Sequence, residues 1–126
     1  MEMLAKILIV DDAIEFCEAL KWILDNEGLE CTIATNGRIA IDLLAHHETH
    51  LILLDWEMPM MNGSEFLRHR ARHRGLLNIP TIVLSAAINI HQLALSLGAT
   101  DFLQKPVDFE TLLAKIGSAL DQSSGF

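Results

Sequence analysis

Short apolar runs alternate with longer segments of helical period along the whole chain. Residues 29–34 alternate only weakly and residues 101–104 form a short run, whereas the runs at 6–10, 51–54 and 81–84 are continuous and rich in Ile, Leu and Val. Runs of this kind are typical of strands that are buried on both faces of a parallel sheet. We therefore predict five strands, at residues 6–10, 29–34, 51–54, 81–84 and 101–104.

The segments between these runs carry apolar residues at every third or fourth position, which predicts amphipathic helices. The first helix is expected at residues 13–27, the second after Asn36-Gly37, the third from about Ser64, the fourth before Gly98 and the fifth after Asp108. Strands that alternate with helices of this length imply right-handed crossovers and a parallel sheet covered on both faces. The predicted fold class is therefore α/β, with five βα units.

The composition fits one globular domain. The chain has 126 residues, 51% of them hydrophobic and 21% charged, which excludes an intrinsically disordered protein. No linker or low-complexity stretch divides it, so we expect a single domain over residues 1–126. The net charge is −8, which argues against direct nucleic-acid binding.

The sequence also argues against a signal peptide or a membrane segment. The apolar start ends at Asp11 before any cleavage site of small residues. Residues 75–100 lack Asp, Glu, Lys and Arg, but Asn78, Pro80 and Asn89 interrupt them, so we do not expect them to span a membrane. Together with the reduced thiols expected of Cys17 and Cys31, this favours a cytoplasmic protein.

Polar residues follow four of the five predicted strands. Asp11 and Asp12 follow the first, Asp55 the third, Ser85 the fourth and Lys105 the fifth. Because ligands of such sheets bind at the carboxyl ends of the strands, we expect these side chains to converge there. Three neighbouring carboxylates repel one another unless a cation is present, and all-oxygen ligands suit Mg²⁺. A lysine and a hydroxyl beside that metal would hold a phosphoryl group, so the pattern predicts a metal-dependent phosphoryl-handling site.

The same residues resemble the receiver (CheY-like) domain of two-component response regulators. The resemblance lies in five ordered motifs and covers about residues 5–121, the expected core of the domain. The motifs are residues 10–12 (Val-Asp-Asp), 54–59 (Leu-Asp-Trp-Glu-Met-Pro) with 61–63 (Met-Asn-Gly), 84–86 (Leu-Ser-Ala), and 98–106, which end in Lys-Pro. The resemblance implies a flavodoxin-like sheet of order 2-1-3-4-5.

The resemblance also implies a role for each site residue. Asp55 would accept a phosphoryl group from a phosphohistidine of a sensor histidine kinase or a phosphotransfer protein, and later lose it by slow self-dephosphorylation. Mg²⁺ would be held by Asp11, Asp12 and Asp55 and by the backbone carbonyl of Glu57, with Asp11 acting largely through water. Ser85, the Ala86 N–H and Lys105 would hold the phosphoryl oxygens, and Phe102 would be the switch aromatic that moves with Ser85. The Lys105–Pro106 bond is cis in the family.

The third and fourth predicted helices depart from the family pattern. Arg70 falls on an apolar helix face, so we expect its charged head to reach water along that face, or the end of the helix to be irregular. It belongs to a cluster of four arginines at residues 68–74, most simply a solvated helix C-terminus. The segment between Ser85 and Gly98 is short, which predicts a short or displaced fourth helix. Because this segment is uncharged and Ile88 and Leu95 lie off its buried face, it is expected to form a homodimer contact or an effector-docking face.

Several other functions fit parts of the pattern. An aspartyl-phosphate phosphatase would need a second acidic residue where Ala13 stands, and a cap domain to capture its substrate. A phosphorylation-independent binding module of the same fold would have no use for the complete set of Asp, Ser and Lys residues. A flavodoxin-like cofactor binder would need a phosphate loop after Val10, which is missing. Asp11 and Asp12 could also simply cap a helix, and Phe102 alone could be an ordinary core aromatic.

Overall fold

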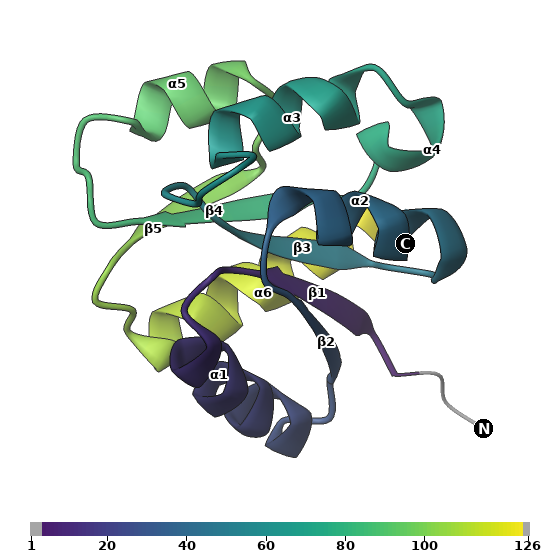
Figure 1. Cartoon of the computed structure of the whole chain (residues 1–126). Helices are drawn as coiled ribbons and strands as arrows, with labels where there is room; N and C mark the ends of the chain where they lie inside the picture. The colour runs from purple at the N-terminus through teal and green to yellow at the C-terminus, as the bar shows by residue number, and fades with distance from the viewer. Residues whose placement is uncertain (1–3, 125–126) are drawn as a thin grey trace.

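The five apolar runs form a parallel sheet that lies between two layers of helices (Figure 1). The computed structural model describes residues 4–124. The strands are β1 (Lys6–Val10), β2 (Glu30–Ala34), β3 (Leu51–Asp55), β4 (Thr81–Ser85) and β5 (Asp101–Gln104). The helices are α1 (Ile14–Asn26), α2 (Gly37–His46), α3 (Gly63–Ala71), α4 (Arg74–Leu77), α5 (His91–Ser96) and α6 (Phe109–Ser124). The strand order is β2-β1-β3-β4-β5, which confirms the predicted fold class and order.

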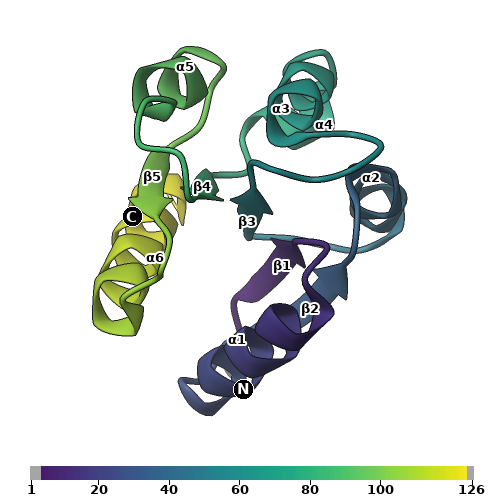
Figure 2. The same cartoon turned by 60° about the vertical axis from the view of Figure 1, so that its left-hand side comes forward.

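Alternate residues of each strand face two separate hydrophobic cores. Ile7 and Ile9 of β1 pack with α1 and α6, whereas Leu8 and Val10 pack with α2, α3 and α5. Figure 2 shows the consequence: α1 and α6 cover one face of the sheet, and the other helices cover the opposite face. Every residue of β3 and β4 is buried, as expected for central strands of a parallel sheet.

Side chains at the helix ends account for several of the predicted boundaries. Asn62 caps α3 in a capping box, because its side chain accepts from the Glu65 N–H while the Glu65 carboxylate accepts from the Asn62 N–H. The Asn36 side chain caps α2 by accepting from the Ile39 N–H, and the Asp108 side chain caps α6 by accepting from the Thr111 N–H. Gly98, with a φ of 103°, closes the turn that follows α5. No helix within residues 4–124 is long and apolar enough to cross a membrane.

The fourth predicted helix is short, as expected. It is α5, which has six residues, while Ile90 and Leu97 flank it as N-cap and C-cap. One further element was not predicted: α4 is a single turn of four residues that begins at Arg74, the last arginine of the basic cluster. Leu76 of α4 packs against the core shared by α2, α3 and α5.

The expectation that the charged head of Arg70 reaches water was wrong. Its side chain is only 4% exposed, and its guanidinium lies inside the molecule rather than in water. It donates to the carbonyl oxygens of Ile79 (2.7 and 3.1 Å), Leu77 (2.9 Å) and Gly98 (3.3 Å). Burial lowers the pKa of Arg70, and the carbonyl dipoles take the place of a counter-ion. Arg70 therefore joins α3 to the segments that enter β4 and β5.

Candidate functional site

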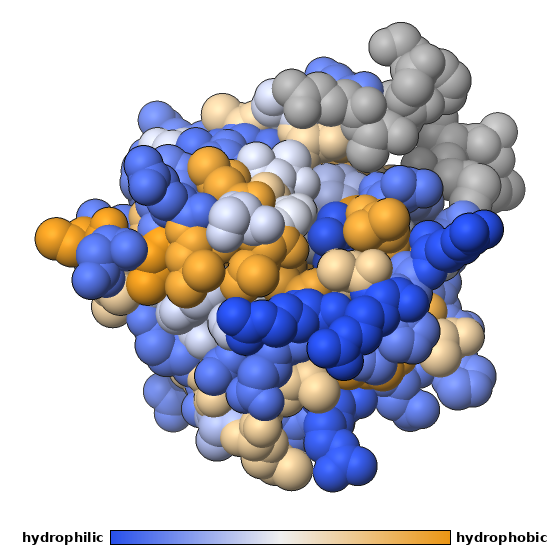
Figure 3. All heavy atoms as spheres, turned by 90° about the horizontal axis from the view of Figure 1, so that it is seen from above, coloured by the Kyte–Doolittle hydropathy of each residue, from blue (hydrophilic) through white to orange (hydrophobic). Residues whose placement is uncertain are grey.

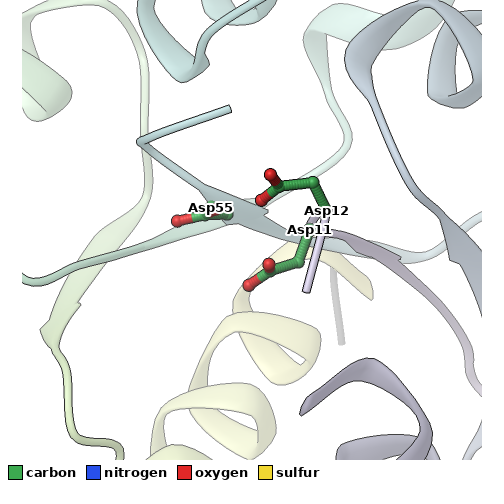
Figure 4. A group of neighbouring side chains, drawn as sticks. All are labelled: Asp11, Asp12 and Asp55. Atoms are coloured by element: carbon green, nitrogen blue, oxygen red, sulfur yellow. The ribbon is translucent and has the colours of Figure 1, made fainter. Parts of the chain in front are cut away.

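Three carboxylates meet at the carboxyl ends of β1 and β3. Val10 of β1 is in register with Leu54 of β3, so the residues that follow them, Asp11 and Asp55, are neighbours. One carboxylate oxygen from each of Asp11, Asp12 and Asp55 lies within 4.8 Å of the others. Figure 4 shows these side chains extending to the same side of the strand ends. Asp11 and Asp55 are buried and Asp12 is exposed, so the cluster opens to solvent on one side.

Lys105 bridges the two buried carboxylates. Its Nζ lies 3.0 Å from Asp11 Oδ2 and 3.2 Å from Asp55 Oδ1, and β5 delivers it to the same edge of the sheet. Burial alone would lower the pKa of Lys105, but the hydrogen bonds and charges of the two aspartates raise it. The ammonium therefore stays charged and offsets part of the negative charge. The Lys105–Pro106 peptide bond that follows is cis.

The surroundings of Asp55 disfavour the ionised form of its carboxyl group. Burial, followed by the negative charge of Asp11, raises its pKa from 3.8 to about 7, although Lys105 acts in the opposite direction. The single cation of Lys105, which Asp55 shares with Asp11, therefore does not fully compensate the Asp55 charge. Such a group is a reactive carboxylate whose ionised form gains from any further cation that binds beside it.

The donor set fits a hard divalent cation. Three carboxylates supply only oxygen ligands, one of them is open to solvent, and their mutual repulsion would be relieved by a doubly charged ion. The Glu57 N–H lies 3.4 Å from Asp55 Oδ1, so the chain folds back over the cluster just after β3. Asp11, Asp12 and Asp55 are therefore suited to hold Mg²⁺, and Glu57 lies near enough to the cluster for its carbonyl to be considered as a fourth ligand.

Ser85 is fully buried at the end of β4, and its hydroxyl takes part in two hydrogen bonds. Its Oγ donates to Glu57 Oε1 at 2.5 Å and accepts from the Ala87 N–H at 3.0 Å. Ala86, which follows directly, is exposed. The Glu57 side-chain contact was not predicted, because the family resemblance pointed only to the Glu57 backbone. The sequence carries no signal for it, since the contact depends on how the loop after β3 folds.

Phe102 lies on β5 and is neither fully buried nor fully exposed. Its ring stacks on the imidazole of His91, with ring centroids 5.0 Å apart and planes inclined by 22°. His91 begins α5, so this ring pair connects the edge strand to the short helix. All predicted site residues except Phe102 thus gather at the carboxyl edge of the sheet, and Phe102 lies three residues before Lys105 on the adjoining strand.

Comparison with known proteins gives consistent matches over nearly the whole chain. The family model described as the response regulator receiver domain matches residues 7–117. The "Transcriptional regulatory protein CpxR homolog" of Haemophilus influenzae is 38% identical over 123 residues, which cover 96% of this chain and 52% of that protein. A protein-glutamate methylesterase/protein-glutamine glutaminase of Treponema pallidum is 39% identical over 111 residues, or 83% of this chain and 27% of that protein.

Solved structures agree with these sequence matches. The response regulator receiver domain protein (CheY-like) from Methanospirillum hungatei superimposes with a TM-score of 0.89 at 30% identity, and the match covers 98% of each chain. The chain spans about half or less of the length of the two curated relatives above. The family model and the Methanospirillum structure both name the receiver domain itself.

Proposed function

This chain belongs to the response regulator receiver domain family, and we propose that it is a signalling switch driven by phosphorylation of Asp55. The proposed donor is a phosphohistidine of a sensor histidine kinase or of a histidine phosphotransfer protein. The observation that supports this most strongly is the meeting of a buried carboxylate, a lysine ammonium and two further carboxylates at one sheet edge. A carboxylate in that setting can act as a nucleophile, and its neighbours supply charges that a phosphoryl group needs.

The proposed transfer moves one phosphoryl group without any redox change. A carboxylate oxygen of Asp55 forms a bond to phosphorus while the P–N bond to the donor imidazole breaks, and the imidazole leaves neutral after taking a proton from solvent. Asp55 must be ionised to attack, which its raised pKa of about 7 opposes. A bound Mg²⁺ would favour that ionised form and neutralise charge on the phosphoryl oxygens.

The neighbours of Asp55 are proposed to hold the product. Lys105, already 3.2 Å from Asp55 Oδ1, would pair with a phosphoryl oxygen, and the Ser85 hydroxyl and Ala86 N–H would donate to others. Slow attack of water on phosphorus would return Asp55 to its free state. The chain would therefore act only on itself and would turn over no outside substrate.

The proposed switch begins with a change of partner at Ser85. In the structure its hydroxyl donates to Glu57, so binding a phosphoryl oxygen requires that contact to break. Movement of Ser85 would disturb the end of β4 and the adjoining β5, where Phe102 stacks on His91. A ring pair at the surface between β5 and α5 can pass such a shift to a partner, because its rearrangement changes which groups are exposed.

Chemical labelling tests the phosphoacceptor directly. The protein is incubated with a small phosphodonor such as acetyl phosphate and Mg²⁺, and the mass of one added phosphoryl group is followed by mass spectrometry. Asp55→Asn is expected to abolish labelling, and chelation of Mg²⁺ is expected to suppress it. Labelling at another residue would contradict the assignment. Lack of labelling in the unaltered protein would favour a phosphorylation-independent binding module, and rapid turnover of a generic phosphomonoester would favour a phosphatase.

Trp56 offers a second readout because it follows Asp55 in the chain. We expect Mg²⁺ to quench tryptophan emission by binding beside the indole. The change should persist in Trp22→Phe, since Trp22 is 70% exposed on α1, away from the site. It should vanish in Trp56→Phe. Equal quenching in both variants would mean that the metal binds elsewhere.

The surface of α5 is the proposed contact for a downstream effector or a second copy of the chain. Figure 3 shows hydrophobic residues gathered over α5 on this face of the molecule. Ile88 is 73% exposed, Leu93 45% and Leu95 41%, and the surrounding residues 75–100 carry no Asp, Glu, Lys or Arg. Leu95→Glu is expected to reduce self-association or effector binding. Trp22→Glu, which adds the same charge to the opposite helical layer, should leave both unchanged.

We propose further that residues 1–126 act as one receiver domain in the cytoplasm, with residues 5–121 as its core. The terminal residues 1–3 and 125–126 of that range lie outside the described residues. The downstream effector would be a separate protein or another domain of the same polypeptide. Direct binding to nucleic acid is not part of this proposal, since the net charge of −8 opposes it.

A further inference from the structure

A groove lies between α2 and the corner formed by the end of α3 and α4. Its volume is about 600 Å³. Three aliphatic side chains, Ile41, Leu44 and Leu76, form its apolar part, and two arginines, Arg72 and Arg74, line its edge. This groove is separate from the carboxylate cluster. Its residues come from the last turns of α2 and α3, which lead into β3 and β4 and so lie at the amino-terminal edge of the sheet.

The cations of this groove have no anionic partner within the described part of the chain. No ion pair between residues 4 and 124 includes Arg72 or Arg74, and no carboxylate lines the groove. His69 and His73 add two imidazoles at the same edge, stacked with ring centroids 4.1 Å apart. Burial, followed by the charges of His73 and Arg72, lowers the pKa of His69, as expected where cations crowd together.

The charge of this region is opposite to that of the rest of the molecule. The segment 68–74 contains four arginines, so the remainder of the chain carries a net charge of −12 against −8 for the whole. Figure 3 shows a band of strongly hydrophilic residues beside the apolar surface of α5 on this helical layer. One of the four, Arg70, is committed to internal carbonyl groups, which leaves three exposed guanidinium groups for an outside partner.

We infer that the groove between α2 and the α3–α4 corner binds a short acidic segment of a partner protein. Carboxylates of that segment would pair with Arg72 and Arg74, because a planar guanidinium matches a carboxylate in two parallel hydrogen bonds. An aliphatic or aromatic side chain between them would fill the apolar part formed by Ile41, Leu44 and Leu76. The inference does not depend on phosphorylation of Asp55.

The electrostatics favour a short acidic segment over an extended polyanion. At physiological salt a charge acts over a Debye length of about 8 Å, so a short segment in the groove interacts mainly with the local arginines. A nucleic acid or an anionic membrane would extend past the groove and meet the surrounding negative surface. Because the groove and the Asp55 site lie at opposite edges of the sheet, a segment could remain bound while a kinase contacts Asp55.

Fluorescence anisotropy of the full chain with a synthetic probe tests this inference. The probe is a fluorescein-labelled peptide in which two leucines lie between pairs of glutamates, and a second peptide carries glutamines instead. Saturable binding of the glutamate peptide is expected, with at least about tenfold weaker binding of the glutamine peptide. The variant R72Q/R74Q is expected to weaken binding by about tenfold as well. Arg38→Gln, which removes the same kind of charge from α2 outside the groove lining, should change binding by less than about twofold.

A second variant tests the apolar part, because charge alone could produce weak binding. Ile41→Ser should weaken the glutamate peptide several-fold, and circular dichroism of every variant establishes that it is folded. The inference is overturned if the glutamate peptide does not saturate, if R72Q/R74Q binds as well as the unaltered protein, or if Arg38→Gln has an equal effect. It is also overturned if a random single-stranded oligonucleotide or vesicles of phosphatidylglycerol compete as well as unlabelled peptide, since the contact would then be a general one with polyanions.

Discussion

Replacing Asp55 by Asn should make the metal-free protein more stable at neutral and mildly alkaline pH. Asp55 is 3% exposed, its neighbour Asp11 is 2% exposed, and one lysine is shared between them. The ionised Asp55 carboxylate is therefore less favourable in the folded protein than in the unfolded chain. Asparagine has nearly the same shape but no charge, so the substitution removes that penalty.

The size of the effect follows from the pKa of Asp55. Its rise from 3.8 to about 7 corresponds to about 4 kcal/mol, because a tenfold change in proton affinity is worth 1.36 kcal/mol. This figure already includes the favourable contact with Lys105, but the amide N–H of the asparagine has to find an acceptor in the buried cluster, and an unmet donor costs about 1–3 kcal/mol. We therefore expect Asp55→Asn to raise the free energy of unfolding by about 1–3 kcal/mol above about pH 8.

The gain should depend on pH in a defined direction. The folded pKa of Asp55 is above its unfolded value, so the folded protein binds more protons between pH 3.8 and about 7 and loses stability as pH rises through that window. The advantage of Asn should thus be small at about pH 5 and fully developed above about pH 8. Urea denaturation followed by circular dichroism in EDTA measures it.

Two controls make this experiment decisive. Asp25 is bound by Lys21 Nζ at 2.9 Å and by the Cys31 N–H at 3.1 Å, and although burial alone would raise its pKa, these contacts lower it. Asp25→Asn should therefore lower stability under the same conditions. Mg²⁺ at about 10 mM with a Kd of about 1 mM would stabilise the unaltered protein by about 1.4 kcal/mol and Asp55→Asn by less. Loss of stability in Asp55→Asn in EDTA, or a gain of equal size at both pH values, would refute the reasoning.

Three further substitutions test other parts of the structure. Lys105→Ala should lower the free energy of unfolding in EDTA by about 3 kcal/mol, because two buried carboxylates lose their cation, and Mg²⁺ should restore part of it in the same urea titration. An unchanged midpoint would argue against the bridge. Glu57→Gln should speed labelling by a small phosphodonor about threefold, since an amide holds the Ser85 hydroxyl less strongly than a carboxylate; slower labelling would mean that Glu57 assists transfer. Arg70→Leu should cost about 2–4 kcal/mol in thermal denaturation, because three carbonyl groups lose their donor, and unchanged stability would show that they find other partners.

The strands, their order and the acidic cluster were predictable because each depends on local pattern or on the topology of parallel sheets. Continuous runs such as residues 51–54 predict central strands, and the residues that follow such strands must share one edge. Three features were not predictable in the same way. The buried position of Arg70 depends on contacts as distant in sequence as the Gly98 carbonyl, and the turn Arg74–Leu77 packs Leu76 against a core that several helices share. The Glu57–Ser85 contact joins residues 28 positions apart through a loop in which Met60 has a φ of 70°.

The short length of β5 and the residues at its two ends limit the addition of a strand from another molecule to this edge of the sheet. As the last strand in the order β2-β1-β3-β4-β5, it exposes one row of peptide groups to which a strand of another molecule could add. It has only four residues, its first residue Asp101 is paired with Lys115 Nζ at 3.0 Å, and Pro106 follows shortly after with no N–H to offer. These features discourage edge-to-edge pairing at β5 and the fibrous aggregates that such pairing initiates, so contacts with other proteins at this edge are left to side chains.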